Sequence, residues 1–144
     1  MIADPLKLSD CSLITDGAAA VVLAADDMAG EFTRPVRFRA AAHVSDVLPL
    51  SAKDLASFEG PTRAIAAAYA QAGGGVNDLS LAEVHDCFTI AELLTIEAPG
   101  KGRAAVIAGE TTREGRLPGA DLAMAVNMGG GAVATYATIL ERVK

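Results

Sequence analysis

A histidine and a cysteine stand two residues apart in the segment His85-Asp86-Cys87-Phe88, referred to below as the tetrad. The chain holds only two histidines and two cysteines, so the tetrad contains one of each. An imidazole exchanges protons near neutral pH, and a thiol next to a helix N-terminus ionises more readily because the helix dipole favours the thiolate. The pair could therefore serve as a proton carrier and a reactive thiol.

The same residues also have a purely structural interpretation. Free cysteine is among the most buried residue types, so Cys87 could be a small core residue and His85 a hydrogen-bonded polar residue. A zinc site is disfavoured, because three adjacent side chains do not all face one ion and the sequence offers no second ligand cluster. The residues alone leave the reactive and the structural interpretation open.

The tetrad lies between a predicted strand at 81–84 and a predicted helix that runs from 89 to about 98. A strand-to-helix junction is a place where α/β proteins often carry their functional groups. Apolar runs, proline and glycine positions predict further elements around it. The expected strands are 16–24, 36–47, 122–126 and 132–140, and the expected helices are 26–30, 61–72 and 102–109.

This order of elements predicts an α/β fold with a five-stranded mixed sheet covered by helices. The last two strands are joined by a glycine-rich turn and are expected to be antiparallel. That turn, Asn127-Met128-Gly129-Gly130-Gly131, would also let a ligand approach the backbone closely. A tight turn between two strands explains this glycine-rich segment equally well. The segment does not match a dinucleotide-binding fingerprint, because a strand rather than a helix follows it.

Length and composition predict one domain with an aliphatic core. The chain has 144 residues, of which 51% are hydrophobic, 4% are aromatic and none is Trp. The core is therefore expected to consist of Ala, Val, Leu and Ile, whose small side chains allow close packing.

Charge and cysteine content narrow the function classes. The net charge is −6 and the basic residues are scattered, which argues against a nucleic-acid surface but not against a phosphorylated small ligand. Cys11 and Cys87 are too far apart for a disulfide framework, which favours a reduced, cytoplasmic protein. The longest apolar run, 17–25, is too short to span a membrane, and the first residues lack a signal-peptide layout.

Together these segments resemble the C-terminal half of thiolases, in the sterol-carrier-protein-type branch. The run Glu-Val-His-Asp-Cys-Phe-Thr-Ile-Ala-Glu at 83–92 closely matches the His-Asp-Cys-Phe box of that branch. Residues 4–23 are similar to the segment that opens this half of the family. Gly-Arg-Leu-Pro at 115–118 is similar to a segment inside it, and residues 127–142 are similar to its closing loop and last strand. The resemblance extends over nearly the whole chain.

The resemblance implies acyl-CoA chemistry, either thiolysis of a 3-ketoacyl-CoA or the reverse Claisen condensation. It implies that His85 donates to the thioester oxygen in an oxyanion hole and that Cys87 moves a proton. Backbone at Asn127, Met128, Gly129 and Gly130 would line the acyl pocket. The CoA thioester would be a substrate, with no permanently bound cofactor or metal. A separate thiolase N-terminal half or a second copy is the partner implied.

Two departures from the family pattern lead us to expect an inactive chain. The family's nucleophilic cysteine belongs to the N-terminal half, and Cys11 does not match its motif. The Gly-His-Pro box is missing, since Pro118 is followed by Gly-Ala-Asp-Leu, and His43 lies in the wrong segment to replace its histidine. Residues 1–144 are thus predicted to be an incomplete thiolase-like C-terminal domain that is inactive alone. The alternative is a non-catalytic acyl-CoA-binding or scaffold subunit.

Overall fold

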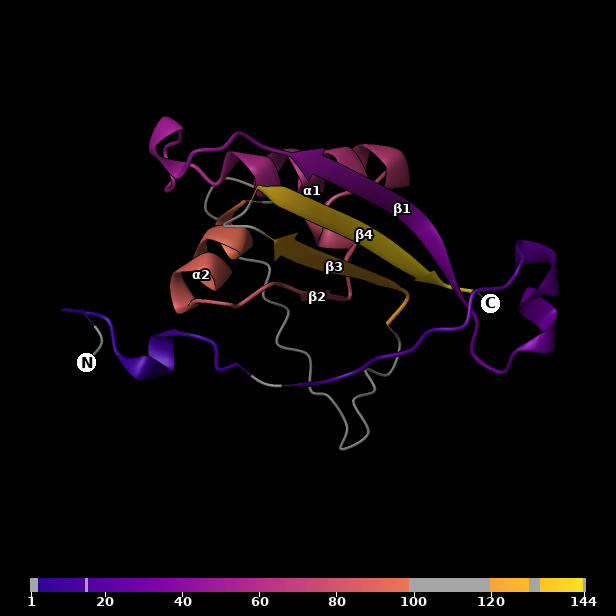
Figure 1. The fold of residues 1–144 in the computed structure, drawn as a ribbon. Helices are drawn as coiled ribbons and strands as arrows, with labels where there is room; N and C mark the ends of the chain where they lie inside the picture. Colours follow the sequence, from indigo (N-terminus) through magenta and orange to yellow (C-terminus); the bar gives the residue numbers. More distant parts are fainter. Residues whose placement is uncertain (1–2, 15, 99–119, 130–132, 144) are drawn as a thin grey trace.

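The computed structural model describes residues 3–14, 16–98, 120–129 and 133–143 (Figure 1). Within these residues it shows one four-stranded sheet in the order β1-β4-β3-β2. The strands are β1 (Val36–Ser45), β2 (Leu81–Glu83), β3 (Leu122–Gly129) and β4 (Ala134–Arg142). The helices are α1 (Glu59–Ala72) and α2 (Thr89–Glu97), with 3-10 turns at Leu8–Asp10, Asp26–Glu31, Leu50–Ala52 and Val76–Asp78.

Three of the strands run in the same direction. Strand β4 pairs antiparallel with both β1 and β3, and β2 pairs parallel with β3. The carboxyl ends of β1, β2 and β3 therefore meet at one end of the sheet. In Figure 1 the arrowheads of β1 and β3 point to the left, towards α2, while the arrowhead of β4 points the other way.

The core lies between one face of the sheet and the helices. Helix α1 presents Ala64, Ile65 and Ala68 to β1 and β4, where Ala137 and Ile139 are fully buried. Small side chains on both sides let the helix approach the strands closely, as the alanine-rich composition predicts. The opposite face of the sheet carries exposed residues, among them His43, Tyr136 and Asn127, so the described helices cover only one face.

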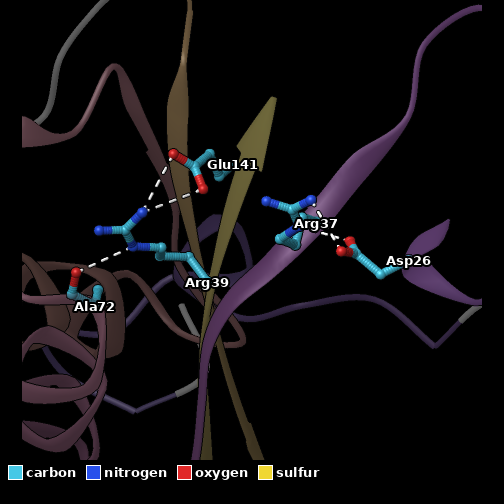
Figure 2. Close-up of polar contacts among 5 residues, drawn as sticks. All are labelled: Asp26, Arg37, Arg39, Ala72 and Glu141. Atoms are coloured by element: carbon cyan, nitrogen blue, oxygen red, sulfur yellow. Dashed lines mark hydrogen bonds and ion pairs between the residues drawn. The ribbon is translucent and has the colours of Figure 1, made fainter. Parts of the chain in front are cut away.

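Arginines of β1 fasten two neighbouring segments to the sheet, as Figure 2 shows. Arg39 donates through Nε to the carbonyl of Ala72 at 3.1 Å and through Nη1 to Glu141 at 3.3 Å. It thereby satisfies a carbonyl at the end of α1, where Gly73 adopts φ 70 and closes the helix. Arg37 binds Asp26 through two bonds of 2.6 and 3.0 Å, which ties the turn at Asp26–Glu31 to β1.

The prediction of five strands is wrong, because residues 16–24 form no strand. The segment runs beside the sheet without pairing to any described strand, and Val21, Val22 and Leu23 are 83%, 86% and 73% exposed. An extended apolar run becomes a strand only where a sheet edge supplies backbone partners. The sequence pattern indicated strand propensity, but the segment pairs with neither edge strand of the described sheet, β1 or β2.

The other predicted elements are confirmed with shifted ends. Helices α1 and α2 match the predictions at 61–72 and 89–98, and β3 and β4 are antiparallel as expected. Strand β3 continues to Gly129 instead of ending at 126, because it pairs with β4 along its full length. Asp26 begins a 3-10 turn and binds Arg37 rather than capping a helix. The predicted helix at 102–109 lies outside the described residues.

None of the helices in the described parts of the chain has the length and apolar character needed to cross a membrane.

Replacing the core residue Ile139 by Ala is predicted to lower the free energy of unfolding by about 2–5 kcal/mol, because the side chain is fully buried between β4 and α1. Urea denaturation followed by circular dichroism measures the change. Val22→Ala is the matched control, since Val22 is exposed and should change stability by less than about 0.5 kcal/mol. Equal losses in the two variants would contradict the assigned core.

Candidate functional site

Three connecting segments gather at the carboxyl end of the sheet. Residues 46–58 follow β1, residues 84–88 follow β2, and the segment after β3 leads through Val133 into β4. Helices α1 and α2 both begin at this end, after Phe58 and Phe88. This is the end where α/β proteins bind ligands, because loops and helix N-termini converge there.

The tetrad occupies the connection between β2 and α2, as the sequence predicted. His85 and Cys87 are half-buried, Asp86 is exposed, and Phe88 is the N-cap residue of α2 without a side-chain cap bond. The structure gives the side chains of His85 and Cys87 no hydrogen bond to any described residue. Both groups therefore keep their hydrogen-bonding capacity for a ligand or for a further protein segment.

The N-terminal segment holds the tetrad from one side. The amide of Ser12 donates to the carbonyl of Cys87 at 2.9 Å, and Cys11 pairs with Phe88 in an isolated antiparallel bridge. The sequence predicted no role for Cys11, because its contact with the tetrad joins segments that are far apart along the chain and leaves no local pattern. Both cysteines are free thiols.

The predicted glycine-rich loop is partly a strand. Asn127 and Gly129 are exposed in β3, Met128 is buried towards the helices, and Gly130 lies outside the described residues. Asn127 lies opposite Tyr136 of β4, which lies opposite His43 of β1. The rings of His43 and Tyr136 stack at 4.3 Å on the exposed face of the sheet.

A cavity of about 530 Å³ lies between the 46–58 segment and the first turns of both helices. Its apolar lining includes Val47, Leu55, Phe58, Ile90 and Leu94. The lining includes neither His85 nor Cys87 nor residues 127–129, so the predicted site residues lie at the same end of the sheet but outside the cavity wall. The size is typical of small-molecule sites.

One buried ion pair stands in the cavity wall. Lys53 Nζ lies 3.0 Å from Asp46 Oδ2, and the two side chains are 9% and 13% exposed. The Lys53 ammonium and the amide of Val47, with a weaker effect of Arg63, hold the pKa of the Asp46 carboxyl below its ordinary value. The sequence gave no sign of this pair, because an Asp and a Lys seven residues apart in a loop carry no recognisable pattern.

Within the described ranges, no three His, Cys, Asp or Glu side chains lie together as metal ligands would. The groups at this end include the His85 imidazole, the Cys87 thiol, the Asp46–Lys53 ion pair and the apolar cavity.

Comparison with known proteins identifies this arrangement. Residues 41–142 match the family described as thiolase C-terminal domain-like. This chain belongs to that family. The match covers the second half of β1, all of β2, β3 and β4, and both helices, so most of the described sheet of the thiolase-like domain belongs to the family's fold.

Curated relatives of the thiolase-like domain agree. Acetyl-CoA acetyltransferase of Methanothermobacter thermautotrophicus is 40% identical over 125 residues, which is 82% of this chain and 33% of that protein. Benzoylsuccinyl-CoA thiolase subunit BbsB of Thauera aromatica is 32% identical over 69% of this chain and 26% of its own length. Sterol carrier protein 2 of Oryctolagus cuniculus is 32% identical over 80% of this chain and 23% of its own length. The chain thus spans between 23% and 33% of these relatives.

Replacing Asp46 by Asn is predicted to lower the free energy of unfolding by the full amount above roughly pH 5, and by progressively less as the pH falls below roughly pH 4. The pKa of Asp46 is depressed in the folded state, so the carboxylate adds stability above its unfolded-state pKa. That stability is lost as the pH falls through the folded-state pKa. Urea unfolding of both proteins across this pH range measures the difference.

The control is the same Asp46→Asn change in a Lys53→Met background. There the main cause of the pKa shift is gone, so the pH-dependent part of the difference should shrink. A difference between wild type and Asp46→Asn that stays constant from pH 7 to pH 3.5 would contradict the assigned ion pair.

Proposed function

We propose that this chain is the C-terminal domain of an acyl-CoA acyltransferase of the thiolase type, which cleaves a 3-ketoacyl-CoA or forms one by Claisen condensation. The observation that carries the proposal is the position of the His-Asp-Cys-Phe tetrad at the carboxyl end of β2, next to the end of β3 and the start of α2. Relatives named as acetyl-CoA acetyltransferase and benzoylsuccinyl-CoA thiolase support chemistry on CoA thioesters.

In this proposal His85 donates a hydrogen bond to the thioester oxygen, where negative charge develops as the α-carbon loses its proton. Cys87 then carries a proton to or from the reacting carbon. Backbone around Asn127, Gly129 and Gly130 contacts the acyl group, and Met128 supports that strand from the buried side. The neighbouring apolar cavity accommodates an uncharged part of the ligand.

The chain alone is expected to be inactive. Thiolase chemistry needs a nucleophilic thiol with an activating base within hydrogen-bond reach, and the sequence has neither in a family position. We propose that a thiolase N-terminal half on a separate chain, or a second copy, supplies the missing groups in the cytoplasm. The exposed apolar run Val21-Val22-Leu23 supports such a partner, because it exposes surface that partner contact would bury.

A non-catalytic acyl-CoA-binding or scaffold subunit is the second candidate. It is favoured by the separation of the cavity from the tetrad, since His85 and Cys87 are not in the cavity lining. Such a subunit would bind acyl-CoA and pass it to a partner without changing it.

His85→Ala is predicted to weaken acetoacetyl-CoA binding by up to about tenfold, because one hydrogen-bond donor to the ligand is lost. Isothermal titration calorimetry of the purified chain measures the affinity. His43→Ala is the matched control, since it removes the other histidine, which stacks on Tyr136 of β4, and should leave the affinity unchanged. Equal affinity of wild type and His85→Ala would contradict the oxyanion role.

Thiolysis of acetoacetyl-CoA separates the two candidates. We expect no turnover by the chain alone above a Cys87→Ala control, and turnover once a thiolase N-terminal half is co-expressed with it. In that complex Cys87→Ala should lower kcat by about 10²–10⁴, as expected for loss of a general acid–base group. Turnover by the isolated chain would refute its inactivity, and a stable complex without turnover would favour the scaffold subunit.

A further inference from the structure

The ion pair between Asp46 and Lys53 differs from the other ion pairs of the described chain in its burial. Its side chains are 9% and 13% exposed, whereas those of the other three pairs are 33–69% exposed. A buried ion pair tolerates little displacement of its two side chains, because each charge is shielded from water and is neutralised only by the other. A pair of this kind fixes the relative position of the segments that carry it.

Asp46 contacts three segments at once. Its amide donates to the carbonyl of Val133 at 2.7 Å, which joins the end of β1 to the turn that leads into β4. Its carboxylate accepts from the amide of Val47 at 2.8 Å and binds Lys53 at 3.0 Å. Val133 in turn donates to the carbonyl of Gly129 at 3.1 Å. One residue thus links the cavity wall, through Val133, to the end of β3 at Gly129.

The cavity wall at 52–58 has few other ties to the sheet. Its remaining hydrogen bonds stay within residues 49–62, as in the bonds from Ser57 to the carbonyl of Asp54 and from Thr62 to the carbonyl of Phe58. Residues 54–57 are exposed. Lys53 is therefore the one described residue of 52–58 that forms an ion pair with the end of β1.

We propose that Asp46 is a positioning residue, which holds the cavity wall and the end of β3 at Gly129 in a fixed relative position through Lys53 and Val133. The inference rests on the proposed function, because it assigns both segments to one acyl-CoA site. Asp46 touches no reacting atom in this role. It makes the site a single unit, so that a ligand seated in the cavity meets the end of β3 at a set distance.

Amide hydrogen exchange tests this link without any ligand. Lys53→Met should speed the exchange of the Asp46 and Val133 amides by roughly tenfold, although Lys53 lies in a different segment. Lys53→Arg, which keeps the charge, should restore slow exchange. Arg142→Met is the matched control, because it breaks an ion pair at the other end of β4 and should leave both amides unchanged.

Faster exchange confined to 52–58, with unchanged Asp46 and Val133 amides, would overturn the proposal. If Lys53→Met does not fold, Asp46→Glu serves in its place, because it keeps the charge and moves the carboxylate by one methylene. Faster exchange of Val133 in that variant supports the proposal and unchanged exchange overturns it.

Acetoacetyl-CoA titration then links the residue to the site. Lys53→Met should bind the ligand about tenfold more weakly than wild type, with binding recovered in Lys53→Arg. If the wild-type protein binds no acetoacetyl-CoA, the proposed function is refuted. The hydrogen-exchange result would still decide whether Asp46 couples the two segments. Unchanged affinity in a variant with faster Val133 exchange would overturn the link to ligand binding.

Discussion

Strand β4 lies between β1 and β3 and pairs antiparallel with both, and this pairing sets the direction of every other strand in the described sheet. Because β1 and β3 must both oppose β4, their carboxyl ends emerge at the same end, and β2 joins them by pairing parallel with β3. This arrangement brings the tetrad, the cavity wall and the end of β3 to the same end of the sheet. Local contacts, such as those of Ser12 with Cys87 and of Asp46 with Lys53, then hold the segments there.

The alanine-rich core has a second effect on the site. Ala40, Ala64, Ala68 and Ala137 leave little side-chain bulk between α1 and the sheet. The helix axis is therefore held close to the strands, and its first turn is placed at the carboxyl end rather than above the middle of the sheet. The cap at the other end, made by Arg39 and Gly73, fixes where the helix stops.

Local sequence patterns predicted the elements, and the family resemblance predicted the chemistry. Pro61 and Gly73 marked the ends of α1 well, because proline and glycine act through backbone geometry that needs no partner. The strand at 16–24 was predicted wrongly because a strand depends on a neighbour that the pattern does not contain. The Asp46–Lys53 pair, the Cys11–Phe88 bridge and the His43–Tyr136 stack escaped prediction for the same reason, since each joins segments whose meeting depends on the fold.

The unpaired run at 17–25 also has a consequence for the handling of this polypeptide. It is extended, apolar, free of charge from Gly17 to Ala25, and nine residues long, which makes it a template for β-pairing between molecules. Asp16 and Asp26 stand at its two ends and act as gatekeeper charges that disfavour stacking of many copies. Because no described strand pairs with it, this segment exposes unpaired backbone groups to other molecules, in addition to those on the outer edges of β1 and β2.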